Sequence, residues 1–418
     1  MTTSPKPRRV VVTGLSGICN VGHGREAIWN ALLEGRPNMN PIPQYQGPEW
    51  PVKFGGIVTD WSGKDRIEHG TLKRLDRFAA LGLFAAVEAV EDCGIDFSKE
   101  DPWMCGVVVG SGVGGVHTIE EYIEKMREKG PDRVTPFLVP RLMVNAASGN
   151  ISIRWGLRGP NSAPATACAS GGNAIGDAFQ LIQDGDADVM LTGGAETAMT
   201  PLCMAGFSVM KALSTRNDDM NRASRPFDKD RDGFVLAEGA GIIVIEELEH
   251  AKRRGANIYC ELLGYGSTGD ASHITAPDPD GAGAAHCMEL ALKDAGINAD
   301  QVDHINAHGT STPLGDLAEA KAIRRVFGDH TDTIAVTSTK SVTGHTLGAS
   351  GGIEAMAVAL AIRNGVIPPT ANFDTPDPEC RINVVGNTAR EQDIKYAISN
   401  SFGFGGHNVS LVFGKYTG

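Results

Sequence analysis

Thr166-Ala167-Cys168-Ala169-Ser170-Gly171-Gly172 is the stretch around which the whole chain is organised. Small residues at 161–165 lead into it, and residues 173–182 follow with apolar side chains at helical spacing. This pattern predicts a strand, a sharp turn and a helix, with the Cys168 thiol at the helix N-terminus. Free backbone N–H groups and the helix dipole lower a thiol pKa there, and the same N–H groups can hold an oxyanion. The simpler interpretation is a small buried cysteine in a tight turn.

Length and composition indicate a large soluble chain of two or three structural units. The 418 residues include 52 glycines, many of them paired between apolar runs, which favours tight turns and close backbone approaches. The net charge of -12 argues against bulk binding of nucleic acid, although a local basic patch could still meet an acidic partner.

Cysteine usage and the N-terminus bear on the compartment. The eight cysteines are scattered singly without a CxxC pair, which argues against a zinc site or a disulfide framework and favours a reducing compartment. The apolar run 10–12 behind the basic N-terminus is too short for a signal peptide. No stretch approaches the length of about 18 apolar residues that a membrane span needs. We therefore expect a cytoplasmic protein without a membrane segment.

Hydrophobic periodicity and glycine positions give the expected elements of the first half. The expected helices span 25–33, 72–93, 118–128 and 141–155, and the expected strands span 10–13, 105–109, 189–194 and 241–246. Residues 37–63 are predicted to be a loop region with short strands, and residues 214–235 a charged loop.

The second half repeats the first, which indicates an internal duplication. Three features occur in both halves in the same order. They are a helix with a glycine cap followed by a strand, a turn that leads into a helix, and a strand that ends in paired glycines. The matched segments are 89–109 with 291–307, 166–172 with 344–352, and 189–194 with 396–406. A period near 200 residues is too long for a solenoid, so we expect two fused α/β halves, 1–257 and 258–418, that share a core.

Two motifs resemble ligand sites but lack part of the required pattern. Residues 110–115 match GxGxxG, yet they do not open the first strand–helix unit and no acid follows at the usual distance. These glycines are expected to bring the backbone close to another surface. Residues 228–233 resemble a calcium loop, but Gly239 stands where the twelfth-position glutamate belongs, so a salt-bridged loop is expected.

Two histidines stand on strand-end turns like the one that carries Cys168. His308 follows the strand at 303–307, and His345 lies at the corresponding edge, whereas His304 lies mid-strand and is expected in the core. His407 follows a glycine loop, and its role stays open. A Cys–His pair could serve a hydrolase, which usually needs one base. Two histidines instead favour a pair of N–H donors on one developing oxyanion, as when a malonyl thioester loses CO₂.

At this point the sequence resembles the β-ketoacyl-[acyl-carrier-protein] synthases, specifically their elongating Cys-His-His branch and most closely its synthase II members. The motifs that carry the resemblance are 167–171, 214–217, 225–234, 306–312, 340–345 and 400–406. It covers nearly the whole chain. It implies the thiolase fold, an α-β-α-β-α sandwich of two similar halves, in a homodimer whose partner is acyl carrier protein. No cofactor is required beyond the phosphopantetheine arm that carries the substrates.

The resemblance also implies catalytic roles. Cys168 would take an acyl chain as a thioester, with the backbone N–H groups of Cys168 and Phe404 as the first oxyanion hole. His308 and His345 would donate to the malonyl thioester oxygen. A charged pair, Lys340 and Glu354, would lie behind the histidines, with Lys340 holding His345.

Further positions match the family's substrate and docking residues. Phe404 would gate an acyl tunnel. The tunnel wall would include Val113 and Phe207, and the phosphopantetheine contacts would be Thr310 and Thr312. The carrier-protein docking residues would be Lys73, Arg74 and Lys211. A structural Na⁺ or K⁺ would lie near Asn306, Ala307, Glu354, Ser399 and Asn400. For His407, the family usually has threonine.

Three other readings remain. A polyketide-type ketosynthase has the same chemistry with different chains. A degradative thiolase uses a second cysteine and lacks this Cys-His-His set. A non-catalytic partner subunit that measures chain length typically loses the nucleophile, whereas Cys168 is present here.

Overall fold

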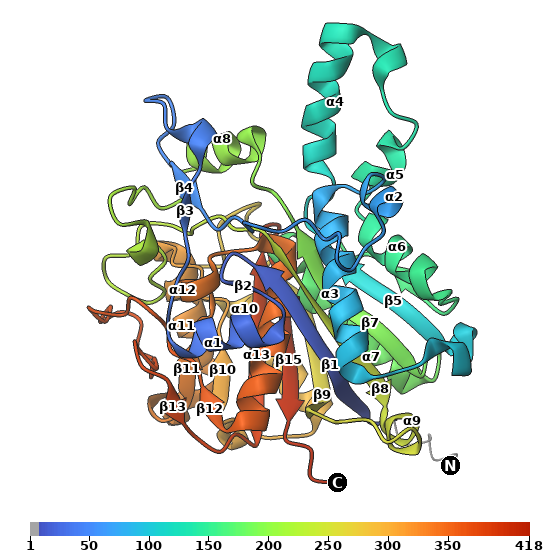
Figure 1. Ribbon diagram of the computed structural model, residues 1–418. Coiled ribbons are helices and arrows are strands. Elements are labelled where there is room, and N and C mark those ends of the chain that lie inside the picture. Colours follow the sequence, from blue (N-terminus) through green and yellow to red (C-terminus); the bar gives the residue numbers. More distant parts are fainter. Residues whose placement is uncertain (1–7) are drawn as a thin grey trace.

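Two sets of strands with the same order form the centre of the molecule (Figure 1). The computed structural model describes residues 8–418, so most of the basic N-terminal stretch lies outside the described residues. The first set runs β6-β5-β7-β8-β1 and the second β11-β10-β14-β15-β9. The first set comprises β1 (Val10–Cys19), β5 (Cys105–Gly110), β6 (Asn161–Ser162), β7 (Val189–Glu196) and β8 (Gly239–Glu247). The second comprises β9 (Cys260–Gly269), β10 (His304–Asn306), β11 (Ala335–Thr337), β14 (Tyr396–Gly403) and β15 (His407–Gly414).

Strand directions repeat as well as strand order. β5 pairs parallel with β7, which pairs antiparallel with β8, and β10, β14 and β15 repeat that pattern. The two sets join where residues 10–12 of β1 pair with residues 260–262 of β9. The duplication inferred from the sequence is therefore a property of the fold.

Two helices lie between the strand sets. α7 (Ser170–Asp184) contacts β5 and β7 on one side and β9 and β15 on the other, and α13 (Ser350–Asn364) likewise touches both sets. Residues 350–362 of α13 are all buried, as is typical of a helix that is apolar on every side. The helices approach through glycines: a Cβ on Gly351 would lie 2.4 Å from the backbone nitrogen of Gly172.

Outer helices cover the far faces and complete five layers, α-β-α-β-α. α3 (Arg77–Cys93) packs on β1, β7 and β8, and α6 (Ala146–Trp155) packs on β5. On the other side α10 (Ala282–Ala295) packs on β9 and β15, with α11 (Pro313–Phe327) against it. This arrangement confirms the expected thiolase-type sandwich of two similar halves.

The remaining elements lie around the five-layer sandwich, and α4 (Val116–Lys129) projects from it in Figure 1. The remaining helices are α1 (Arg25–Leu33), α2 (His69–Leu72), α5 (Leu138–Leu142), α8 (Pro201–Val209), α9 (Leu248–Arg253) and α12 (Lys340–Thr343). The remaining strands are β2 (Gly22–His23), β3 (Asn40–Pro41), β4 (Phe54–Gly55), β12 (Val366–Ile367) and β13 (Arg390–Glu391). No helix within residues 8–418 is both long and apolar enough to cross a membrane.

Two expected helices are each divided in two. The one at 72–93 breaks before α3 because the Asp76 carboxylate caps α3 at the N–H of Phe78 and also accepts the N–H and hydroxyl of Thr118. The one at 141–155 becomes α5 and α6, and the Leu142 carbonyl at the end of α5 accepts the N–H of Gly115.

The expected strands also change at two places. β1 continues past Thr13 to Cys19, because a bulge at Thr13 keeps the ladder going and the missing side chain of Gly14 lets α3 pack there. A Cβ on Gly14 would lie 2.4 Å from the Ala89 carbonyl oxygen. The prediction of a strand that runs directly up to Cys168 is wrong. Only Asn161 and Ser162 form β6, and residues 163–166, which include Pro164, leave the ladder.

Candidate active site

Cys168 lies in a short 3₁₀ turn, Ala167–Ala169, that runs directly into α7. Ala167 has a φ of 51°, a left-handed conformation that is unfavourable for alanine and has to be held by its surroundings. The backbone N–H groups of Cys168 and Phe404 both interact with the Cys168 sulfur. These are the two groups expected to form the first oxyanion hole.

The resting thiol differs from the expectation of a lowered pKa. Burial raises the pKa of Cys168 to about 12, although the Lys340 charge and the N–H of Phe404 act in the opposite direction. Desolvation of the thiolate therefore outweighs the helix N-terminus. In the resting site the sulfur is a protonated thiol that needs a base to become nucleophilic.

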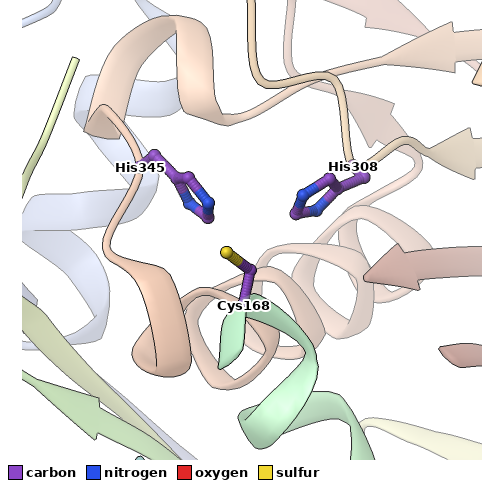
Figure 2. A group of neighbouring side chains, drawn as sticks. All are labelled: Cys168, His308 and His345. Atoms are coloured by element: carbon purple, nitrogen blue, oxygen red, sulfur yellow. The ribbon is translucent and has the colours of Figure 1, made fainter. Parts of the chain in front are cut away.

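The fold brings Cys168, His308 and His345 together from three separate turns (Figure 2). One ligand atom from each of them lies within 4.8 Å of the other two, and all three residues are buried. The imidazole centroids are 5.3 Å apart in a T-shaped arrangement. The three chemical groups that the sequence placed at strand ends thus face one small volume.

Both histidines are neutral in the resting site. Burial lowers the pKa of each well below 6.5, and the positive charge of Lys340 lowers it further. A neutral imidazole has one N–H donor and one lone pair. His345 Nδ1 lies 3.2 Å from the Ser350 hydroxyl, which leaves Nε2 for the cavity. The pair can therefore donate two hydrogen bonds to one oxygen, or accept the thiol proton.

His304 allows a test of whether burial keeps a histidine neutral at a position outside the set Cys168, His308 and His345. It is buried on β10 beside Thr337, as expected for a core residue, and burial lowers its pKa to about 3. Below about pH 6.5 the unfolded chain binds a proton at this residue and the native chain does not, so stability is lost as the pH falls. Between pH 6.5 and 5, the free energy of unfolding measured with urea should fall by about 1.7 kcal/mol more in the wild type than in His304→Leu, with the slope approaching about 1.4 kcal/mol per pH unit at the acid end. Equal losses would contradict a neutral His304.

Lys340 and Glu354 form a buried ion pair between α12 and α13. Their side chains are 1% and 2% exposed, so solvent does not screen the pair. Burial raises the pKa of Glu354, whereas the Lys340 charge lowers it. Because Lys340 lowers the pKa of both histidines, the pair helps to keep them neutral.

Two buried glutamates near the site were not found from the sequence. Glu319 on α11 accepts the backbone N–H groups of His308 and Gly309, each at 2.8 Å, and burial raises its pKa to about 7. Glu196 at the end of β7 accepts the N–H of Gly112 at 2.6 Å and the hydroxyl of Ser111 at 2.8 Å. The glycine loop that formally matches a nucleotide motif therefore holds an internal carboxylate.

A cavity of about 580 Å³ opens onto the three residues. Its lining includes the expected tunnel, arm-contact and gate residues Val113, Phe207, Thr310, Thr312 and Phe404, together with Lys211. Lys73 and Arg74 are exposed on the surface after α2 and are not part of this lining; Arg74 stacks over the Phe137 ring.

Two groups of residues could hold a metal ion. In the cation neighbourhood, Asn306 Oδ1 and Glu354 Oε2 are buried and have no hydrogen-bond partner among the described residues, and Asn306 Nδ2 lies 3.4 Å from the Ser399 hydroxyl. An amide and a carboxylate oxygen suit a hard cation, so these residues fit an alkali ion. Cys168, His308 and His345 also form a set with zinc-type donors, although no Cys/His pair among them has the short sequence spacing of a zinc motif.

Comparisons with known proteins cover almost the whole chain. Two family models match it: the beta-ketoacyl synthase N-terminal domain over residues 7–251 and the beta-ketoacyl synthase C-terminal domain over residues 259–374. The chain is 48% identical over 409 residues to 3-oxoacyl-[acyl-carrier-protein] synthase 2 of Synechocystis sp., covering 98% of each. It is 49% identical to the protein of that name from Vibrio harveyi, covering 98% of this chain and 99% of the relative.

A solved structure gives the same picture in three dimensions. A ketosynthase bound to the hexaketide, in complex with its type II polyketide acyl-carrier protein, superposes with a TM-score of 0.92 at 34% identity. The match covers 98% of this chain and 100% of that one.

Proposed function

Because the chain belongs to the β-ketoacyl synthase family, we propose that it condenses malonyl-[acyl-carrier-protein] with an acyl chain held on Cys168 and so elongates fatty acids by two carbons. The observation that carries this proposal is the convergence of one thiol and two neutral imidazoles at 4.8 Å or less in a buried cavity. Full-length similarity to synthases named 3-oxoacyl-[acyl-carrier-protein] synthase 2 supports the fatty-acid assignment.

In the first step Cys168 is acylated. The sulfur loses its proton to a neighbouring imidazole and attacks the carbonyl carbon of the carrier thioester. The N–H groups of Cys168 and Phe404 stabilise the oxyanion. The carrier thiolate then leaves and takes up the proton, so the step is an exchange of one thioester for another.

In the second step the malonyl thioester loses CO₂. The bond to the carboxylate breaks and its electron pair becomes an enolate, whose oxygen accepts hydrogen bonds from His308 and His345. The enolate carbon attacks the acyl carbonyl on Cys168, and the sulfur leaves as the new carbon–carbon bond forms. Lys340 and Glu354 act behind the imidazoles by keeping them neutral donors.

Acyl carrier protein is the proposed partner, and no redox or organic cofactor is assigned to the enzyme itself. Thr310 and Thr312 would contact the phosphopantetheine arm, and Phe404 would gate the acyl tunnel past Val113 and Phe207; all five line the cavity. An alkali ion would be held by Asn306 Oδ1 and Glu354 Oε2, the two buried oxygens without a hydrogen-bond partner among the described residues, and would supply a structural positive charge there.

A cytoplasmic homodimer is the proposed state of the protein. β6 is the last strand in the order and has no partner on its outer side among residues 8–418, and large apolar side chains are exposed on α4, α5, α6 and the loops beside them. They are Ile123, Met126, Phe137, Val139, Met143 and Ile153. The eight free thiols support the reducing compartment.

The decisive experiment supplies purified protein with malonyl carrier protein and acyl carrier proteins of graded chain length, with products identified by mass. We expect one condensation per acyl chain and release of CO₂. Repeated additions onto an unreduced β-ketoacyl product would instead favour the polyketide-type ketosynthase. Absence of condensation with every primer would refute both.

Charge reversal at the proposed docking residues should weaken use of the carrier. Lys73→Glu with Arg74→Glu is expected to raise the apparent KM for malonyl carrier protein at low salt, with little change in kcat, because both side chains are exposed and lie outside the cavity lining. The matched control reverses the exposed adjacent pair Lys252 and Arg253 on α9. An unchanged KM in the first variant would remove these residues from the docking site.

A further inference from the structure

Tyr265 of β9, in the second half of the chain, packs against α7, the helix that follows Cys168. Its ring lies on α7 at Gly176, where a Cβ would come within 2.3 Å of a ring carbon. Its hydroxyl accepts the Asn173 side-chain N–H at 2.8 Å and donates to the Asp177 carboxylate at 3.3 Å. Asn173 and Asp177 are four residues apart and share one face of α7, so the hydroxyl joins both side chains.

The same hydrogen-bond chain reaches the nucleophile turn. The Thr166 hydroxyl donates to Asn173 Oδ1 at 2.5 Å, and Asn173 is only 9% exposed. Between Thr166 and Cys168 stands Ala167, whose left-handed φ persists only while its neighbours are fixed. The hydrogen bond that fixes the Thr166 side chain therefore helps to set the orientation of the Cys168 N–H.

Thr166 is also where the two segments with oxyanion donors meet. Gly403, which precedes Phe404, lies so close that a Cβ there would be 2.5 Å from the Thr166 carbonyl oxygen and 3.2 Å from the Cys168 nitrogen. The Cys168 N–H belongs to the first half and the Phe404 N–H to the second. Their relative placement depends on how the halves are joined beside Thr166.

We propose that Tyr265, acting through Asn173 and Thr166, is a positioning residue that holds the Cys168 turn in register with the Phe404 N–H. It is absent from the cavity lining, so it acts through the backbone and touches no substrate. The role in condensation rests on the proposed function. The effect on the reactivity of Cys168 does not, because alkylation of the thiol needs neither carrier nor malonyl group.

The test removes one oxygen from the network. In Tyr265→Phe, alkylation of Cys168 by iodoacetamide, followed by peptide mass, should slow about tenfold, since one net hydrogen bond corresponds to roughly that factor. The kcat for condensation should fall by a similar factor while the KM for malonyl carrier protein stays unchanged. Thr166→Val should reproduce both effects and Thr166→Ser should restore both rates. Combining Tyr265→Phe with Thr166→Val should add little, because both break one network.

Tyr259→Phe is the matched control. Burial raises the pKa of both phenols to about 12, and the Tyr259 hydroxyl also bonds a carboxylate, that of Asp92 at 2.9 Å, in a different network. In Tyr259→Phe, Cys168 should be alkylated at the wild-type rate, even if the melting temperature of this variant falls as far as that of Tyr265→Phe. Wild-type alkylation in Tyr265→Phe, or equal slowing in Tyr259→Phe, would overturn the proposal. If the wild type failed to condense, the proposed function would fall and the alkylation series would still decide the role of Tyr265.

Discussion

His308→Ala and His345→Ala are each expected to lower the rate of condensation by about 10²–10³, the usual effect of removing one oxyanion donor. Both imidazoles are neutral and buried, so each can donate one hydrogen bond to the malonyl thioester oxygen as CO₂ leaves. In acylation of Cys168 the oxyanion is held by the N–H groups of Cys168 and Phe404, and the thiol proton needs only one imidazole, which each variant retains. The acyl-enzyme should therefore still form in both variants.

The measurement separates the two steps. Mass analysis of the intact protein after mixing with acyl carrier protein reports the acyl-enzyme, and product masses after malonyl carrier protein is added report condensation. His345→Asn keeps an N–H donor and should recover part of the lost rate, whereas the core variant His304→Leu should keep the condensation rate. Near wild-type condensation by either alanine variant would refute the assignment of two donors.

Residues at strand ends could be predicted because parallel strands expose their carboxyl ends at one edge. His308 follows β10 directly, and the turn at His345 repeats the turn at Cys168, so the duplicated pattern alone brings all three toward one edge. Two fused α/β halves were predictable from the internal duplication, whereas the five-layer order of the sandwich was implied by the family resemblance. In the structure, Gly171 and Gly351 lie at the crossing of α7 with α13, where a Cβ on Gly351 would be 2.4 Å from the Gly172 nitrogen, and Gly352 lies so close to β8 that a Cβ would be 2.0 Å from the Gly241 carbonyl oxygen.

Features that depend on distant partners could not be predicted from local pattern. The Glu196 carboxylate accepts the N–H of Gly112, which lies 84 residues earlier in the chain. The Glu319 carboxylate accepts the N–H of Gly309, only 10 residues earlier, but this contact depends on how α11 packs against the turn that carries His308. The helix break before α3 depends on Thr118, which lies 42 positions after Asp76. The pKa of Cys168 is raised because segments from both halves bury the thiol, which no local pattern shows. The helix N-terminus, which predicted a lowered pKa, can be recognised from residues 166–172 alone.

Glu354→Gln is expected to be the most destabilising single change near the site. Lys340 is 1% exposed, and losing its carboxylate partner leaves a buried charge unpaired, which typically costs about 3–5 kcal/mol. Lys340→Met should cost less, because Glu354 can take up a proton once the Lys340 charge that lowers its pKa is gone. Urea unfolding at neutral pH measures both losses.

The double variant, Lys340→Met with Glu354→Gln, separates stability from catalysis. Replacing a whole buried pair by uncharged groups is often nearly neutral, so much of the stability lost in Glu354→Gln should return. Burial, the larger cause of the lowered pKa of His308 and His345, persists in the double variant, but the Lys340 charge that lowers the pKa further is absent, so imidazolium forms at a higher pH than in the wild type. In the double variant the acid limb of the pH–rate profile should therefore move upward. A stable double variant with a wild-type profile would show that the pair serves folding alone.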